Sequence, residues 1–160
     1  MDELDMELQK ELQDLVAKRD VKHLRIFFDE HNIVDLAAIV EEMTIEEAIF
    51  IFKVIPTDIY GDLFSYTSAE KQEKLVELLT GSEIKGIVEN LYSDDIADFI
   101  TEMPDELAKK ILKSVSPEQR GEINTLLSYK ENSCGSIMTM DYVDLNENMS
   151  IEEAMDVVTK

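Results

Sequence analysis

Residues 83–103 read EIKGIVENLYSDDIADFITEM and contain the same pattern twice. An acidic residue opens each copy, aliphatic residues follow at offsets 1 and 5, and an apolar residue stands at offset 8. These offsets lie on one face of a helix with 3.6 residues per turn. The stretch therefore predicts two short amphipathic helices joined by a brief connection.

The same pattern recurs along most of the chain at steps of 11 to 13 residues. Each unit holds about two turns of helix, and isolated helices below roughly 12 residues are marginal in water. The helices must therefore stack on one another, which predicts an all-α solenoid. The regular copies open at Asp35, Glu47, Asp58, Glu83 and Asp95. Less regular copies open at Glu70, Glu106 and Glu118.

Hydroxyl residues precede the repeated segments, in the position where a side-chain oxygen can accept from a free helix N–H. Thr44 with Glu47, and Ser116 with Gln119, have the spacing of capping boxes. Two more helices are expected before the repeats, one over residues 2–18 and one that Asp20 caps. The predicted caps within the repeats are Thr44, Thr57, Ser68, Ser82, Ser93 and Ser116.

The pattern stops at residues 131–136, ENSCGS, which predicts a linker after a helical domain over 1–130. Beyond it, Tyr142, Val143 and Leu145 predict a short strand, and Ser150 with Glu153 predicts a capped final helix. One strand and one helix cannot form a core. Residues 137–160 are therefore expected to begin a second domain that continues outside this chain.

The charge balance limits the possible partners. The 160 residues include 15 Lys and Arg against 36 Asp and Glu, which gives a formal net charge of -21. Such a surface repels nucleic acid and anionic lipid and favours inorganic cations. The longest apolar runs are five residues, LAAIV (36–40) and AIFIF (48–52). A membrane helix needs roughly 20, so the chain is not expected to cross a bilayer.

Residues for catalysis are not grouped in any known motif. His23 and His31 are the only histidines and are expected on the surface of the second helix and near its end. Cys134 is the only cysteine, stands in a polar segment and has no basic neighbour to activate it. No glycine-rich phosphate loop is present. The sequence therefore predicts a protein that is not an enzyme.

Asp94 and Asp98 are candidates for binding a cation. With Ser93 as the N-cap, Asp94 and Asp95 occupy the first turn, where acids stabilise the helix dipole by about 0.3–1 kcal/mol each. Asp98 lies one turn further, and like charges at i and i+4 repel. A hydrated Mg²⁺ would remove that repulsion, since it needs only one or two carboxylates. Spacing alone leaves a cation site and a solvated acidic face both open.

Three segments together resemble the cytosolic N-terminal part of MgtE-type magnesium transporters. They are SDDIADFI (93–100), residues 116–129, and SCGSIMTMDYVDLNENMSIEEAMD (133–156). The last looks like the entry into the family's first cystathionine-beta-synthase (CBS) domain. The resemblance covers nearly the whole chain and implies a right-handed superhelix of short helices, followed by a truncated CBS strand and helix.

The resemblance implies a regulatory domain on the cytoplasmic face of the cell membrane, within a homodimeric transporter. In that family the domain packs against CBS domains when Mg²⁺ is plentiful and so favours the closed pore. The family's Mg²⁺-binding carboxylates fall at Asp62, Asp94 and Asp98. Asp62 is unusual in its own repeat as well, because the other copies carry apolar residues there: Ile39, Ile51, Ile87 and Phe99.

The alternative interpretation is a helical-repeat scaffold for protein interactions with no role for an ion. The flagellar motor switch protein FliG contains similar helical repeats and is the concrete example. The tail distinguishes the two, because a CBS-like strand and helix after the repeats fits the transporter and not the motor protein.

Overall fold

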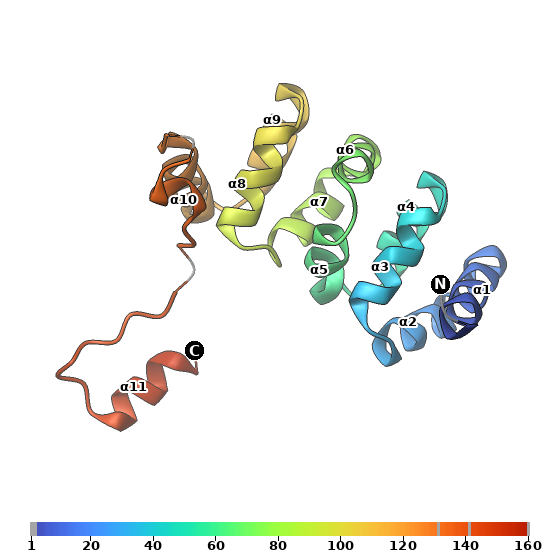
Figure 1. The fold of residues 1–160 in the computed structure, drawn as a ribbon, viewed down its shortest axis with the longest axis horizontal. Coiled ribbons are helices and arrows are strands. Elements are labelled where there is room, and N and C mark those ends of the chain that lie inside the picture. Colours follow the sequence, from blue (N-terminus) through green and yellow to red (C-terminus); the bar gives the residue numbers. More distant parts are fainter. Residues whose placement is uncertain (1–2, 131, 141, 160) are drawn as a thin grey trace.

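A computed structural model describes residues 3–130, 132–140 and 142–159. Helices are the only regular elements in these described ranges, as the all-α prediction requires. Figure 1 shows a row of helices along the long axis of the molecule, with α1 at one end and α10 at the other. They are α1 (Glu3–Lys18), α2 (Val21–Glu30), α3 (Ile33–Glu42), α4 (Ile45–Val54), the 3-10 turn η1 (Thr57–Ile59), α5 (Tyr60–Ser65), α6 (Ala69–Leu78), α7 (Gly81–Val88), α8 (Ser93–Glu102), α9 (Asp105–Ser114), α10 (Pro117–Ser128), η2 (Cys134–Ile137) and α11 (Ile151–Val158).

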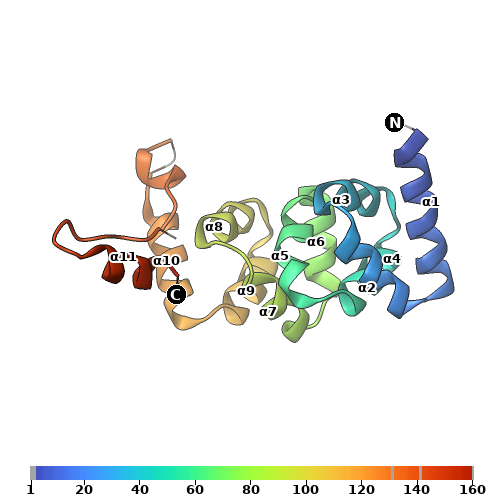
Figure 2. The ribbon, with the colours of Figure 1, turned by 90° about the horizontal axis from the view of Figure 1, so that it is seen from below.

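The row of helices is a solenoid in which each helix from α3 to α10 packs mainly against the second helix along the chain, whereas α1 packs mainly against α2. The main packed pairs are α3 with α5, α4 with α6, α5 with α7, α7 with α9, and α8 with α10. Figure 2 shows the same row from below, with α1 and α10 at opposite ends. The predicted stacking of short helices is confirmed.

Each of the eight repeats corresponds to one helix from α3 to α10, and the copy that opens at Asp58 is divided between η1 and α5. One residue that the pattern predicts to be buried is exposed. Tyr66 is 54% exposed, because α5 ends at Ser65 and Tyr66 lies beyond its last turn. Most of the residues at offsets 1 and 5 in the regular copies are buried: Leu36, Val40, Ala48, Phe52, Leu63, Ile84, Val88, Ile96 and Ile100.

Several predicted caps are present. Thr44 and Glu47 form a full capping box, and Asp20 accepts from the amide of His23. Ser68 and Ser116 each accept from an amide in the first turn of the next helix. The side chain of Gln119, in contrast, reaches the preceding helix pair and donates to two backbone carbonyls, those of Val88 and Leu91, at 3.1 Å each.

Three predicted caps inside the repeats, Thr57, Ser82 and Ser93, lie inside a helix and not before it. Ser82 lies within α7, and Thr80, two residues earlier, caps that helix in a box with Glu83. Thr57 lies within η1, which Pro56 precedes without a side-chain cap. In all three places the periodic pattern locates the helix correctly, but the chain enters it one or two residues earlier than expected.

Two lysines join helices that are three apart in the row. The Nζ atom of Lys71 on α6 donates to the carbonyls of Val40, Glu41 and Met43 at 2.6, 2.8 and 2.6 Å, where α3 ends. Lys71 is buried, and burial lowers the pKa of its ammonium group. The final carbonyls of a helix have no partner within it, so these bonds satisfy the end of α3.

Lys110 repeats this arrangement at the next step of the solenoid. Its Nζ atom, on α9, donates to the carbonyls of Val76, Glu77 and Leu79 at 2.7, 3.1 and 2.7 Å. These carbonyls belong to the end of α6, the helix that carries Lys71. The structural repeat therefore also has a longer unit of three helices, α3–α5 and then α6–α8, which the 12-residue pattern does not show.

Gly61 allows a close approach between α5 and the segment that follows α7. A Cβ atom at this position would lie 2.3 Å from the backbone oxygen of Asn90, which follows α7. Asn90 also donates from its side chain to the carbonyl of Thr57, at 2.9 Å. The segment that carries Asp62 is thus held against the end of α7 by direct backbone contact.

The tail differs from its prediction in one respect. No strand forms at Tyr142, Val143 and Leu145 within the described ranges, because a strand needs a partner to accept and donate its hydrogen bonds. The final helix is confirmed as α11, with Ser150 and Glu153 in a capping box. In Figure 1, α11 stands apart from the row at the end of an extended stretch.

Candidate functional site

The candidate site is built on α8, which presents Asp94 in its first turn and Asp98 one turn later. Ile96 and Ile100 are buried on the opposite face and fix the rotation of the helix. Asp94 is half-buried and Asp98 is exposed. The 3.6-residue period therefore places both carboxylates at the surface, on one side of α8.

The carboxylates on α8 repel one another. Partial removal from water raises the pKa of Asp98, and the negative charges of Asp94 and Glu102 raise it further. The folded chain therefore binds a proton at Asp98 more readily than the unfolded chain. The resulting contribution to stability is present at acidic pH and is lost as the pH rises from the ordinary aspartate value through the raised pKa. Asp98 opposes folding at neutral pH unless a cation compensates it.

Ser93 has a different place from the one predicted. It is the first residue of α8 rather than the residue before it, and Tyr92 flanks the helix. The buried Ser93 hydroxyl donates to Oε2 of Glu122 on α10, at 2.7 Å. This bond joins the start of α8 to α10, so the helix that carries the aspartates is fixed at its N-terminal end.

Thr139 is a residue of the site that the sequence patterns did not indicate. Its hydroxyl donates to Oδ1 of Asp94, at 3.2 Å, across 45 residues of sequence. Met138 and Met140 on either side pack against the hydrophobic core of the row. The alternation of apolar, polar and apolar residues in Met138-Thr139-Met140 is the one local signal, since it separates two half-buried side chains from an exposed one.

Asp62 lies on a different helix from the other two candidates. It is exposed on α5, whereas Ile39, Ile51 and Ile87 at the same offset in other repeats are buried. The rings of Phe64 and Phe99 meet edge to face with centroids 5.4 Å apart, which joins α5 to α8. Among the described residues, no three His, Cys, Asp or Glu side chains converge as a metal cluster. The structure therefore brings Asp94 and Asp98 together and leaves Asp62 separate.

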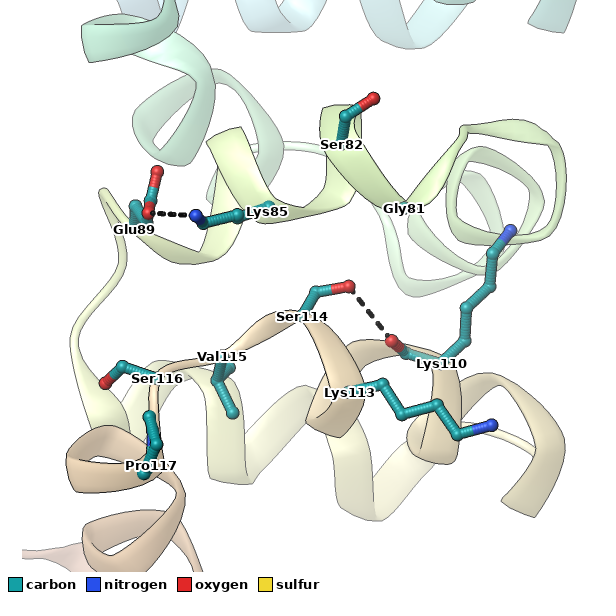
Figure 3. A pocket seen from close by; sticks show the side chains of 10 residues that line it. All are labelled: Gly81, Ser82, Lys85, Glu89, Lys110, Lys113, Ser114, Val115, Ser116 and Pro117. Atoms are coloured by element: carbon teal, nitrogen blue, oxygen red, sulfur yellow. Dashed lines mark hydrogen bonds and ion pairs between the residues drawn. The ribbon is translucent and has the colours of Figure 1, made fainter.

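A separate cavity of about 760 Å³ lies between α7, α9 and the start of α10. Figure 3 shows Lys85 paired with Glu89 on one side, at 3.4 Å, and Lys113 on the other. None of the three candidate aspartates lines this cavity. Its lysines and hydroxyls come with no nucleophile paired to a base, so it gives no support to a catalytic function.

The histidines lie where the sequence predicts. His23 is exposed on α2, with Nδ1 2.7 Å from the carboxylate of Asp20. His31 follows the end of α2, stacks on Phe27 and contacts its carbonyl oxygen at 2.8 Å. Each histidine therefore has a local structural partner. In the described part of the chain, no helix combines the length and the apolar character that a bilayer crossing requires.

The chain matches known proteins over most of its length. Residues 31–132, more than half of the chain, match the model of the MgtE intracellular N domain. A curated relative, the magnesium transporter MgtE of Thermus thermophilus, is 26% identical over 155 residues, which cover 95% of this chain. The chain spans about a third of that relative, 34% of its length.

Two solved structures share the fold. The crystal structure of the soluble part of a magnesium transporter matches with a TM-score of 0.86 and 20% identity, over 97% of this chain and 61% of the other. The crystal structure of the cytosolic domain of the Mg²⁺ channel MgtE in complex with ATP matches with a TM-score of 0.82 and 26% identity, over 94% and 62%.

The curated relative is named as a transporter, and the two solved structures are a soluble part of a transporter and a cytosolic domain of a channel. None of these names describes an enzyme, which agrees with the prediction at the level of the family. They favour the transporter interpretation over the helical scaffold similar to FliG. The all-α row of short helices, the repeats and the matched range agree on one family. The chain belongs to the family of the MgtE intracellular N domain.

Proposed function

We propose that this domain is the Mg²⁺-sensing regulatory part of a magnesium transporter or channel. Asp94 and Asp98 on α8, with Asp62 on α5, contribute carboxylates to Mg²⁺ at an interface with CBS domains, and the bound state favours a closed pore. The observation that carries this proposal is the pair Asp94 and Asp98, which lie one turn apart on one side of α8. Partial removal from water and the nearby negative charges of Asp94 and Glu102 raise the pKa of Asp98, and a bound cation would favour its charged form.

The two carboxylates on α8 fit Mg²⁺ as part of a site. Mg²⁺ binds oxygen ligands, keeps several waters and is commonly held by one or two protein carboxylates. Asp94 and Asp98 supply two carboxylates on one side of α8. No group of three His, Cys, Asp or Glu side chains in the described ranges could hold a metal ion, so waters or another domain would complete the coordination. This is the arrangement expected of a site that forms between two surfaces.

The tail supports the proposed second surface. The exposed fractions of Ile151, Met155 and Val158 are 86%, 56% and 55%, and these residues follow one face of α11. An amphipathic helix normally buries such a face. We assign residues 137–160 to the start of a CBS domain, residues 1–130 to the sensing domain and 131–136 to the linker. The complete protein would be a homodimer whose sensing domains lie on the cytoplasmic face of the membrane.

A comparison of stability with and without Mg²⁺ tests this function. Without divalent cations, Asp98→Asn should raise the free energy of unfolding by about 0.5 kcal/mol, because it removes two like-charge pairs one helical turn apart. With MgCl₂ at 100 times the dissociation constant, the unmodified chain should gain about 2.7 kcal/mol and the variant much less. Without Mg²⁺ the variant should therefore be the more stable of the two proteins, and with Mg²⁺ the unmodified chain should be. Urea unfolding at constant ionic strength measures both stabilities.

Asp35→Asn is the matched control for this comparison. Asp35 is a first-turn acid of α3, far along the row from α8. Its loss should cost about 0.3–1 kcal/mol through the helix dipole and leave the gain from Mg²⁺ intact. An equal gain from Mg²⁺ in all three proteins would show general screening of the acidic surface and would rule out a site at Asp98.

A further inference from the structure

The segment 138–140 connects the candidate site to the chain that follows it. It comes directly after η2, which packs against the end of α10. Met138 and Met140 pack on the core of the row, and Thr139 between them is exposed and donates to Asp94. The first residues of the tail are thus attached to the helix that carries the candidate aspartates.

The turn before this segment is closely fitted to α10. A Cβ atom at Gly135 would lie 2.5 Å from the ring of Tyr129, the residue that ends α10. Within the turn, Ser136 donates from both its amide and its hydroxyl to the carbonyl of Ser133, at 3.2 and 2.9 Å. These contacts fix the direction in which the chain leaves α10 and bring Thr139 to α8.

The bond from Thr139 leaves part of Asp94 available. A carboxylate has about four lone-pair positions on two oxygens, and the Thr139 hydroxyl occupies one of them on Oδ1. A donor on one oxygen fixes the rotation of the carboxylate and keeps the other oxygen free for a cation. Such outer partners orient the groups that bind a metal, and their loss typically costs 10–100-fold in affinity.

We propose that Thr139 is a positioning residue for Asp94, and that the segment 138–140 transmits Mg²⁺ binding at α8 to the chain beyond residue 140. The inference rests on the proposed function and adds a regulatory element to the same site. Coupling of this kind is reciprocal. If the attached segment holds Asp94 for Mg²⁺, then Mg²⁺ must in turn hold the segment on the row.

Amide hydrogen exchange at residues 138–140 tests the attachment without any cation. Thr139→Val removes the hydroxyl at nearly constant shape, and exchange there should accelerate about fivefold, as expected for the loss of one hydrogen bond. Asp94→Ala should have the same effect because it removes the acceptor. Asp98→Ala, which removes an equal charge from the same helix, should leave the exchange unchanged, and Thr139→Ser should retain the slow exchange.

The second arm repeats the exchange during a titration with MgCl₂ at constant ionic strength. Mg²⁺ should slow exchange at 138–140 in the unmodified chain, and Thr139→Val should bind Mg²⁺ about tenfold more weakly, with Thr139→Ser close to the unmodified chain. Equal affinity in the unmodified chain and Thr139→Val would overturn the coupling alone. Failure of the unmodified chain to bind Mg²⁺ would overturn the proposed function, and the coupling with it, while the cation-free arm still reports on the attachment.

Discussion

Lys71→Met should lower the free energy of unfolding by about 3 kcal/mol. The ammonium group of Lys71 makes three hydrogen bonds of 2.6 to 2.8 Å to carbonyls at the end of α3, and bonds from charged donors stabilise proteins by about 1.5–3 kcal/mol. Methionine retains the apolar stem, so the variant isolates the loss of the donors. Urea unfolding followed by far-ultraviolet circular dichroism measures the effect.

Lys74→Met is the matched control on the same helix. Lys74 is exposed and pairs with Glu70 at 2.5 Å, one turn away. Exposed pairs of this kind are worth less than about 1 kcal/mol. A loss from Lys71→Met no larger than that from Lys74→Met would contradict the role assigned to Lys71 at the junction of α3 and α6.

Gly61→Ala should destabilise the chain by about 2 to 3 kcal/mol, the usual cost of forcing extra atoms into a packed contact. The added Cβ atom would lie 2.3 Å from the backbone oxygen of Asn90, and backbone atoms cannot turn aside as a flexible side chain can. The helix α5 must then move away from the end of α7. Because Asp62 follows directly, its carboxylate moves with the helix. Urea unfolding measures the loss.

The same substitution at Gly121 should have the opposite sign. Gly121 lies inside α10, and an added Cβ atom there meets nothing within 4 Å. Alanine in a helix interior is favoured over glycine by about 0.5–1 kcal/mol. Gly121→Ala should therefore stabilise the chain slightly. Equal effects at Gly61 and Gly121 would show that the contact with Asn90 yields easily.

The row of helices could be predicted because every short helix needs apolar residues at the same offsets. Offsets 1 and 5 must be apolar for a short helix to bury a face, as Leu36 and Val40 do, and the spacing of the acids marks each new helix. The first residue of each helix is harder to predict than the helix itself. Thr80 and Ser82 both precede the buried face of α7, and only the box with Glu83 decides between them.

Contacts between distant helices could not be predicted from the repeats. Lys71 reaches carbonyls about 30 residues away, and a 12-residue period carries no information on which helices become neighbours. Thr139 and Asp94 are 45 residues apart for the same reason. The prediction of a strand at 142–145 is wrong because β-propensity only indicates how well a residue packs within a sheet. The described part of the chain supplies no second strand to form that sheet.

The candidate site could be predicted only in part. The spacing of Asp94 and Asp98 predicts that they lie on one side of a helix, and the structure places both on α8, one turn apart. Their part in binding Mg²⁺ stays a prediction. Asp62 came from the family resemblance and from its unusual offset, and its part in binding Mg²⁺ stays a prediction. An exposed aspartate on a neighbouring helix joins the site only if a partner or an ion connects the two surfaces.

An amide NMR titration of this chain with MgCl₂, at ionic strength held constant with NaCl, tests the central claim most directly. We expect chemical shifts that saturate, cluster around Asp62, Asp94 and Asp98, and disappear in the double variant Asp94→Asn, Asp98→Asn. A slow drift of the whole acidic surface without saturation, or saturation at other residues, would contradict the claim that these carboxylates bind Mg²⁺.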